Sequence, residues 1–163
     1  MSNEMQDLWQ EMEQAHNTLI AALGRFLQGD KNTRLRLITE GYRTNRYLVI
    51  FVLRYVVPEE LKELLPFLMS HARSVHGYLH HVREIILRLP RDWLLEHIEA
   101  VAEPLLKTGS DDDYRRFLEL YFQIDPKLTE HLAQRAADSP DPDIREAGED
   151  FLEKLGHRQG QGA

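Results

Sequence analysis

The sequence contains no cysteine among its 163 residues. Disulfide bonds, thiolate metal sites and a cysteine nucleophile are therefore excluded, and this composition favours a reducing, cytoplasmic location. Glycine is also scarce, with 9 residues, and the Asn-Gly hairpin turn does not occur. No run alternates apolar and polar residues over the length of a strand. These absences predict an all-α protein.

Long apolar runs and catalytic motifs are missing as well. The longest strongly apolar run, YLVIFVL at residues 47–53, is far shorter than the ~20 residues that cross a bilayer. The first residues, MSNEMQDLWQEMEQ, lack the apolar centre of a secretory signal, so we expect neither a leader nor a membrane partner. The patterns GxxxxGK[ST], GxGxxG and GxSxG are absent. We therefore expect no enzymatic activity and no cofactor.

Basic residues are outnumbered, with 20 Lys and Arg against 27 Asp and Glu, and the formal net charge is −7. This acidity disfavours nucleic acid as a partner. Residues 31–57 depart from it, because they hold six basic residues and one acidic residue. An alternative function is thus nucleic-acid or phosphate-ligand binding through this basic segment. Its candidate residues are Arg34, Arg36, Arg43, Arg46 and Arg54.

What the sequence does contain is helical periodicity along its whole length. Apolar side chains in residues 8–27 recur at helical spacing, and Gly-Asp at residues 29–30 ends this first helix. Tyr42, Tyr78 and Tyr114 then recur at intervals of 36, and each is predicted to open an apolar helix that ends before a proline. We interpret this recurrence as a repeated helix–turn–helix unit, which the segment DPDIREAGEDFLEKLG closes.

Residues 58–156 resemble HEAT-type repeats, including the short variety of phycobilin-lyase-like proteins, and residues 31–57 do so more weakly. The segments AEPLLKTGSDDDYRRFLEL and LTEHLAQRAADSPDPDIREAGEDFLEKLG carry the pattern. The resemblance implies a right-handed α-solenoid of about three to four helical hairpins, with residues 1–30 as an N-terminal capping helix. We expect one domain over residues 1–156 and a disordered tail at residues 157–163.

The resemblance also implies roles for particular side chains. Around the loop between the two helices of a repeat, Asp and Arg form a structural ladder between neighbouring repeats. The residues that fit this role are Asp113, Arg115, Asp143 and Arg145. The repeat spacing of 30–36 is shorter than the ~40–47 residues usual for HEAT repeats.

Overlaying the second helices of the repeats separates two faces. One face is predicted to form the core, from Tyr78, Val82, Ile85, Ile86, Leu89, Tyr114, Phe117, Leu118, Tyr121 and Phe122. The other face mixes Arg, His and aromatic residues, which are typical of interface hot spots, and second helices line the concave surface in solenoids of this resemblance. We therefore predict an adaptor or scaffold whose protein partner is not identified. The predicted partner-binding residues are Arg43, Tyr47, Phe51, Arg54, Leu79, His80, Arg83, Leu87, Arg115, Arg116 and Glu119.

Several alternatives stay open at this point. The N-terminal helix could cover Tyr47, Phe51 and Leu87 itself, or it could form a homo-oligomer. His76, His80 and Glu84 share one helical face and are a minor candidate for a metal site, although we expect no metal. A HEAT-like alkylpurine DNA glycosylase is disfavoured by the acidic charge, and a phycobilin-lyase-like role in assisting a client protein is a further hypothesis.

Overall fold

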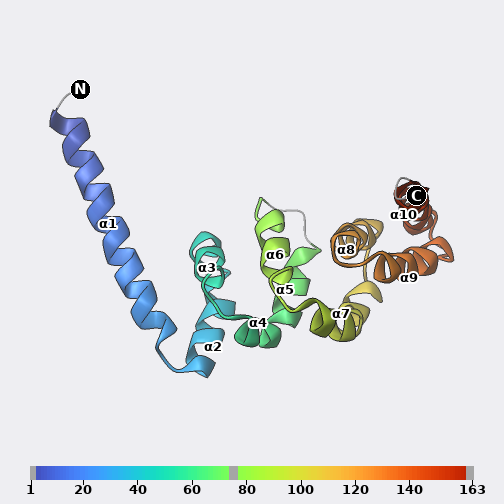
Figure 1. The fold of residues 1–163 in the computed structure, drawn as a ribbon, viewed down its shortest axis with the longest axis horizontal. Helices are drawn as coiled ribbons and strands as arrows, with labels where there is room; N and C mark the ends of the chain where they lie inside the picture. Colours follow the sequence, from blue (N-terminus) through green and yellow to red (C-terminus); the bar gives the residue numbers. More distant parts are fainter. Residues whose placement is uncertain (1–2, 74–76, 161–163) are drawn as a thin grey trace. The chain divides into compact units, whose positions relative to one another are not determined.

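A computed structural model describes residues 3–73 and 77–160, and in this part of the chain every regular element is an α-helix (Figure 1). The prediction of an all-α protein is therefore confirmed. The chain forms two compact units, residues 1–60 and residues 61–163. A single domain over residues 1–156 stays a prediction. Among the described helices, none has the length and apolar character that crossing a membrane requires.

The first unit is built from three helices and the start of a fourth. These are α1 (Asn3–Leu27), α2 (Lys31–Gly41), α3 (Arg46–Leu53) and α4 (Pro58–Glu63). Asp30 caps α2, because its side chain accepts a 2.8 Å hydrogen bond from the Thr33 backbone N–H, which lowers the pKa of Asp30. Asn45 caps α3 in the same way, accepting from the Leu48 N–H at 3.0 Å.

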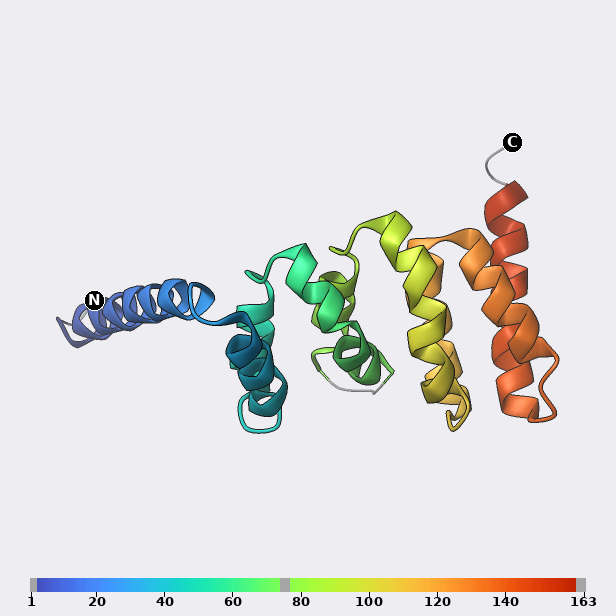
Figure 2. The same ribbon diagram turned by 90° about the horizontal axis from the view of Figure 1, so that it is seen from below.

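The second unit contains the six remaining helices of the described chain. They are α5 (Leu65–Ala72), α6 (Leu79–Ile86), α7 (Arg91–Leu106), α8 (Asp111–Ile124), α9 (Pro126–Ala137) and α10 (Pro142–Gly160). Helix α5 packs against α6 and α7, and α10 packs against both α8 and α9. Figure 2 shows α9 and α10 side by side. The acidic run at residues 111–113 is the first turn of α8, where Ser110 and Asp113 form a capping box.

The predicted core face of the second helices lies inside the second unit. Val82, Ile85, Ile86, Phe117 and Leu118 are buried, as are Leu89, Tyr114 and Tyr121. Tyr78 and Phe122 are half-buried. Burial of each such large apolar side chain contributes about 1.5–3 kcal/mol, so this face is a main source of the unit's stability.

Two boundary predictions are wrong. Tyr42 does not open a helix: it is the C-cap of α2, because Asn45 starts the next helix three residues later. Residues 157–160 were expected in a disordered tail, yet α10 continues through them to Gly160. His157 lies 3.4 Å from Glu153, a pair that supports the last turns of this helix. Residues 161–163 lie outside the described part.

Ion pairs connect helices of the second unit at a recurring sequence separation. In five such pairs the two side chains lie 32 to 36 residues apart. The pairs are Arg83–Glu119, Arg91–Asp125, Arg115–Asp150, His131–Glu99 and Arg135–Glu103. These pairs join α6 to α8, α7 to α9 or its N-cap Asp125, and α8 to α10, so each connects a helix to the second helix after it.

Candidate interaction site

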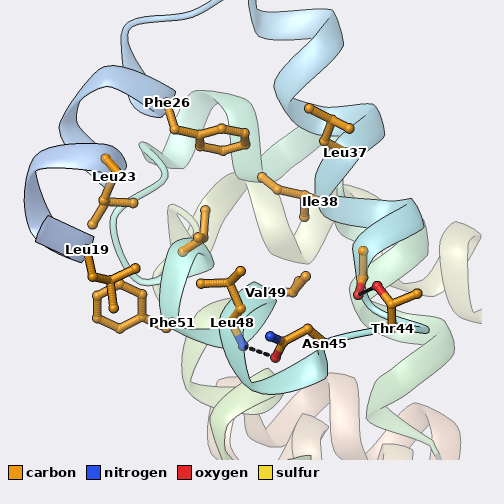
Figure 3. Close-up of a pocket in the computed structure, with 13 residues that line it drawn as sticks. Leu19, Leu23, Phe26, Leu37, Ile38, Thr44, Asn45, Leu48, Val49 and Phe51 are labelled. Atoms are coloured by element: carbon orange, nitrogen blue, oxygen red, sulfur yellow. Dashed lines mark hydrogen bonds between the residues drawn. The ribbon is translucent and has the colours of Figure 1, made fainter. Parts of the chain in front are cut away.

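An apolar pocket lies in the first unit between α1, α2 and α3 (Figure 3). Its volume is about 310 Å³. The lining residues are Leu19, Ala22, Leu23, Phe26, Leu37, Ile38, Gly41, Thr44, Asn45, Leu48, Val49, Phe51 and Val52. Leu37 and Leu48 are 45% and 39% exposed, so the apolar wall is open to a partner.

The few polar groups at the apolar pocket bind each other. The Asn45 side chain accepts from the Leu48 N–H at 3.0 Å, and the Thr44 hydroxyl donates to the Gly41 carbonyl at 3.1 Å. Both are local turn and capping interactions. The apolar pocket therefore offers shape and apolar contact, and its residues carry no acid–base or nucleophilic chemistry.

Helix α1 continues this apolar surface away from the pocket. Its apolar side chains follow a spacing of three and four residues, which places them along one face. We call Met5, Leu8, Met12, Ala15, Leu19, Ala22 and Phe26 the α1 stripe. Met5 and Met12 are 61% and 64% exposed, and the neighbouring Trp9 is 61% exposed. An exposed apolar face of this length indicates an interaction site.

The predicted partner-binding residues of the first unit lie on or beside α3. Tyr47 is 72% exposed, so α1 does not cover it. Phe51 is half-buried and lines the apolar pocket, with Leu19 of α1 close by (Figure 3). Arg43 and Arg54 are exposed.

In the second unit, three predicted partner-binding residues form one cluster. Arg83 donates to a Glu119 carboxylate oxygen at 2.6 Å and to the Arg116 carbonyl at 3.0 Å. Arg116 donates to Glu119 at 2.9 Å. Burial alone would raise the pKa of Glu119, but the hydrogen bonds from the two arginines outweigh it and hold that pKa below its usual value. These side chains thus connect α6 to α8.

This cluster makes the stability of the second unit sensitive to acid. The pKa of Glu119 is depressed in the folded chain. The carboxylate therefore contributes fully to the free energy of unfolding at pH values above its pKa in the unfolded chain, near 4.5. The contribution is lost as the pH falls through the folded value. We expect Glu119→Gln to lower the free energy of unfolding at neutral pH and to flatten its decline below about pH 4.5. Urea titrations from pH 7 to pH 3 would measure this; parallel curves for the variant and wild type would contradict it.

The other Arg and Asp predictions have mixed outcomes. Arg115 donates to Asp150 of α10 at 2.7 Å, which raises the pKa of Arg115, and Asp113 of α8 lies 3.5 Å from Arg73. These contacts join α8 to α10 and to the C-cap residue of α5, while the ladder between repeats stays a prediction. Arg145, in the first turn of α10, instead donates to the carbonyls of residues 139 and 140 in the loop that precedes this helix. The backbone N–H of Asp143 bonds to the Asp141 side chain.

The remaining predicted residues lie on α6. Leu79 is half-buried and Leu87 is 38% exposed. His80 lies 3.1 Å from Glu84, whereas His76 is outside the described residues. In the part of the chain that the structure describes, no group of three His, Asp or Glu side chains could hold a metal ion.

The basic segment is largely used inside the first unit. Arg34 is buried, where it donates to the Gly29 carbonyl and pairs with Glu60. Arg36 lies 3.6 Å from Glu40, and the Arg46 guanidinium lies 5.0 Å from the centre of the Tyr42 ring. These contacts leave fewer cations for phosphate groups than the sequence suggests.

A second cavity, of about 260 Å³, lies between α7, α8 and α9. Its rim carries the pairs His131–Glu99 and Arg135–Glu103, and Tyr121 lies in its wall. Burial raises the pKa of Tyr121, so its hydroxyl stays protonated at neutral pH. The lining carboxylates of Glu99 and Glu103 already contact His131 and Arg135, and the cavity holds no activated nucleophile.

The apolar pocket is the feature that sequence reasoning missed. Its signal was the strict three-and-four spacing of the α1 stripe, together with the apolar run of α3. Comparisons with protein-family models, curated proteins and solved structures find no match to this chain.

Proposed function

We propose that this chain is a non-enzymatic adaptor that binds an apolar helical segment of a protein partner in the apolar pocket. The observation that carries the proposal is the continuous exposed surface of the apolar pocket and the α1 stripe. Three helices border the pocket, and such helix-lined grooves accept the apolar face of an amphipathic helix. The contacts would be apolar, with anchors entering the pocket at helical spacing.

The architecture that we propose for this adaptor is a HEAT-like α-solenoid in the cytoplasm. The recurring ion pairs at separations of 32 to 36 residues support equivalent stacking of successive helical hairpins. Within this proposal, Arg83, Arg115 and Glu119 of the second-helix face act mainly in joining hairpins. The exposed Tyr47 and Arg43 remain candidates for contact with the partner.

The proposal predicts that Leu37→Glu abolishes partner binding. Leu37 is 45% exposed in the pocket wall, so the substitution should leave the fold intact while placing a charge where an apolar anchor binds. We expect recovery of the partner to fall at least tenfold, a loss typical of an interface hot spot. A photo-crosslinking residue at position 37 in source cells would identify the partner, and pull-downs with the variant would measure the loss.

The matched control is Val57→Glu. Val57 is 54% exposed in the same unit and does not line the apolar pocket, so this variant adds the same charge elsewhere. It should retain wild-type recovery. Equal recovery by Leu37→Glu and wild type would remove the apolar pocket from the proposed function.

A further inference from the structure

We infer that the helix bound in the apolar pocket is α1 of a second copy of this chain, in an antiparallel, two-fold symmetric pair. This inference rests on the proposed function, because it requires that the apolar pocket binds a helix. In the pair, the N-terminal half of each α1 lies along the C-terminal half of the other α1 and over its pocket. The chain would therefore be its own helical ligand.

Helix α1 lacks packing along most of its length. Residues 4–22 are all exposed, which is about five helical turns. An isolated helix of that length is marginal in water, and helices in proteins depend on burial of an apolar face. The exposed Met, Leu and Trp side chains of α1 provide such a face, so a second helix is needed to cover it.

The α1 stripe also provides a register for two antiparallel copies. Its residues occupy alternate a and d positions of a heptad, which is the seam of a coiled coil. If two copies run antiparallel about a centre between residues 13 and 14, a large side chain opposes a small one in two of the three kinds of pair. Met5 then faces Ala22 of the second copy, Leu8 faces Leu19, and Met12 faces Ala15. Because Ala22 lines the apolar pocket, Met5 of the second copy would enter that pocket.

The distribution of charge favours the same antiparallel pair. Residues 3–14 hold four acidic residues and no basic one, whereas residues 31–57, which form α2 and α3, hold six basic residues and one acidic. An antiparallel pair places the acidic half of one copy beside this basic segment of the other, in which Arg34 is the only buried arginine. The same register puts Glu4 beside Arg25 of the second copy, twice in each dimer. A parallel pair would instead bring two acidic halves together.

Charge also argues against a membrane surface as the occupant. Helices that lie on membranes carry Lys and Arg on the polar face, which anionic lipids attract. The polar face of α1 is acidic, with Glu4, Asp7, Glu11 and Glu13, and its only basic residue is Arg25. Anionic lipid would repel this helix.

The first test is the association state of the purified full chain by sedimentation equilibrium. We expect a dimer in wild type, and we expect Met12→Glu to weaken dimerisation at least about a hundredfold, since the dimer buries this side chain twice. Gln10→Glu adds the same charge on the opposite face of α1 and should dimerise as wild type does. A wild-type chain that stays monomeric, or that binds anionic phosphatidylserine vesicles through α1, would overturn the inference.

Charge reversal tests the register. Glu4→Arg or Arg25→Glu alone sets like charges side by side, which should weaken the dimer about tenfold. The double variant restores opposite charges and should dimerise to within about threefold of wild type. Additive losses in the double variant would exclude this register.

Cysteine crosslinking tests the direction of the helices, because the chain has no cysteine of its own. Mild oxidation of mixed Met5→Cys and Ala22→Cys chains should give a mixed disulfide dimer, and each variant alone should not crosslink efficiently. Crosslinking of each variant with itself would indicate a parallel pair and overturn the inference. If the wild-type chain is monomeric but binds a different protein, and Leu37→Glu abolishes that binding, the inference fails and the proposed function stands. If neither self-association nor any Leu37-dependent partner is found, both fail.

Discussion

Replacing Gly148 by alanine is expected to lower the free energy of unfolding of the second unit by about 3 kcal/mol. A Cβ at this position would lie 2.4 Å from the Ala137 N, 2.5 Å from the Ala133 O and 2.9 Å from the Ala136 C. All three are backbone atoms, so no side-chain rotation relieves the overlap. Helices α9 and α10 would have to separate. This separation would disturb the packing around Ala133 and Ala136, which are fully buried. The ~1 kcal/mol that alanine gains over glycine in helix propensity is too small to compensate.

The control for this substitution is Gly156→Ala in the same helix. A Cβ at Gly156 meets no heavy atom within 4 Å, so only helix propensity acts, and the free energy of unfolding should rise by up to about 1 kcal/mol. Urea denaturation followed by circular dichroism would measure both variants. If Gly148→Ala were as stable as Gly156→Ala, the close contact between α9 and α10 would be wrong.

Removing the carboxylate of Glu60 is expected to destabilise the first unit by about 3–5 kcal/mol, the range measured when a buried ion pair loses one partner. Arg34 is 7% exposed, and its guanidinium pairs with Glu60 and donates to the Gly29 carbonyl. In Glu60→Ala the guanidinium keeps its charge and its burial but loses its counter-ion. Unfolding by heat and hydrogen exchange of the α2 amides would both report the loss.

Two further variants separate this effect from a general loss of charge. Arg36 and Glu40 form an exposed pair at 3.6 Å in the same helix, so Glu40→Ala should change stability by no more than about 0.5 kcal/mol. The double variant Arg34→Met and Glu60→Ala removes both charges and should recover most of the stability, because an apolar side chain of similar volume replaces the pair. If Glu60→Ala and Glu40→Ala changed the free energy of unfolding equally, the stability of the first unit would not depend on the pairing of Arg34 with Glu60.

The sequence by itself was sufficient to predict the all-α class and the buried face of the second helices. Residues such as Ile85, Ile86 and Phe117 recur at helical spacing, and the side chains within a few positions of each other determine both the helix and its apolar face. Helix starts are local for the same reason. Ser110 and Asp113 cap α8 through hydrogen bonds that span three residues.

Only the tertiary structure decided which surfaces stay uncovered and which charges have partners. Local sequence does not determine whether another segment packs on a side chain. This applies to the exposure of Met5 and Met12, to the burial of Arg34 and to the contact of Gly148 with α9. Periodicity predicts that a helix has an apolar face, but it does not predict what covers that face. Burial of the face depends on which other element packs against it. For the same reason Arg83 could be recognised as part of a polar face from the sequence, whereas its bond to Glu119 required the packing of α6 against α8 to be known.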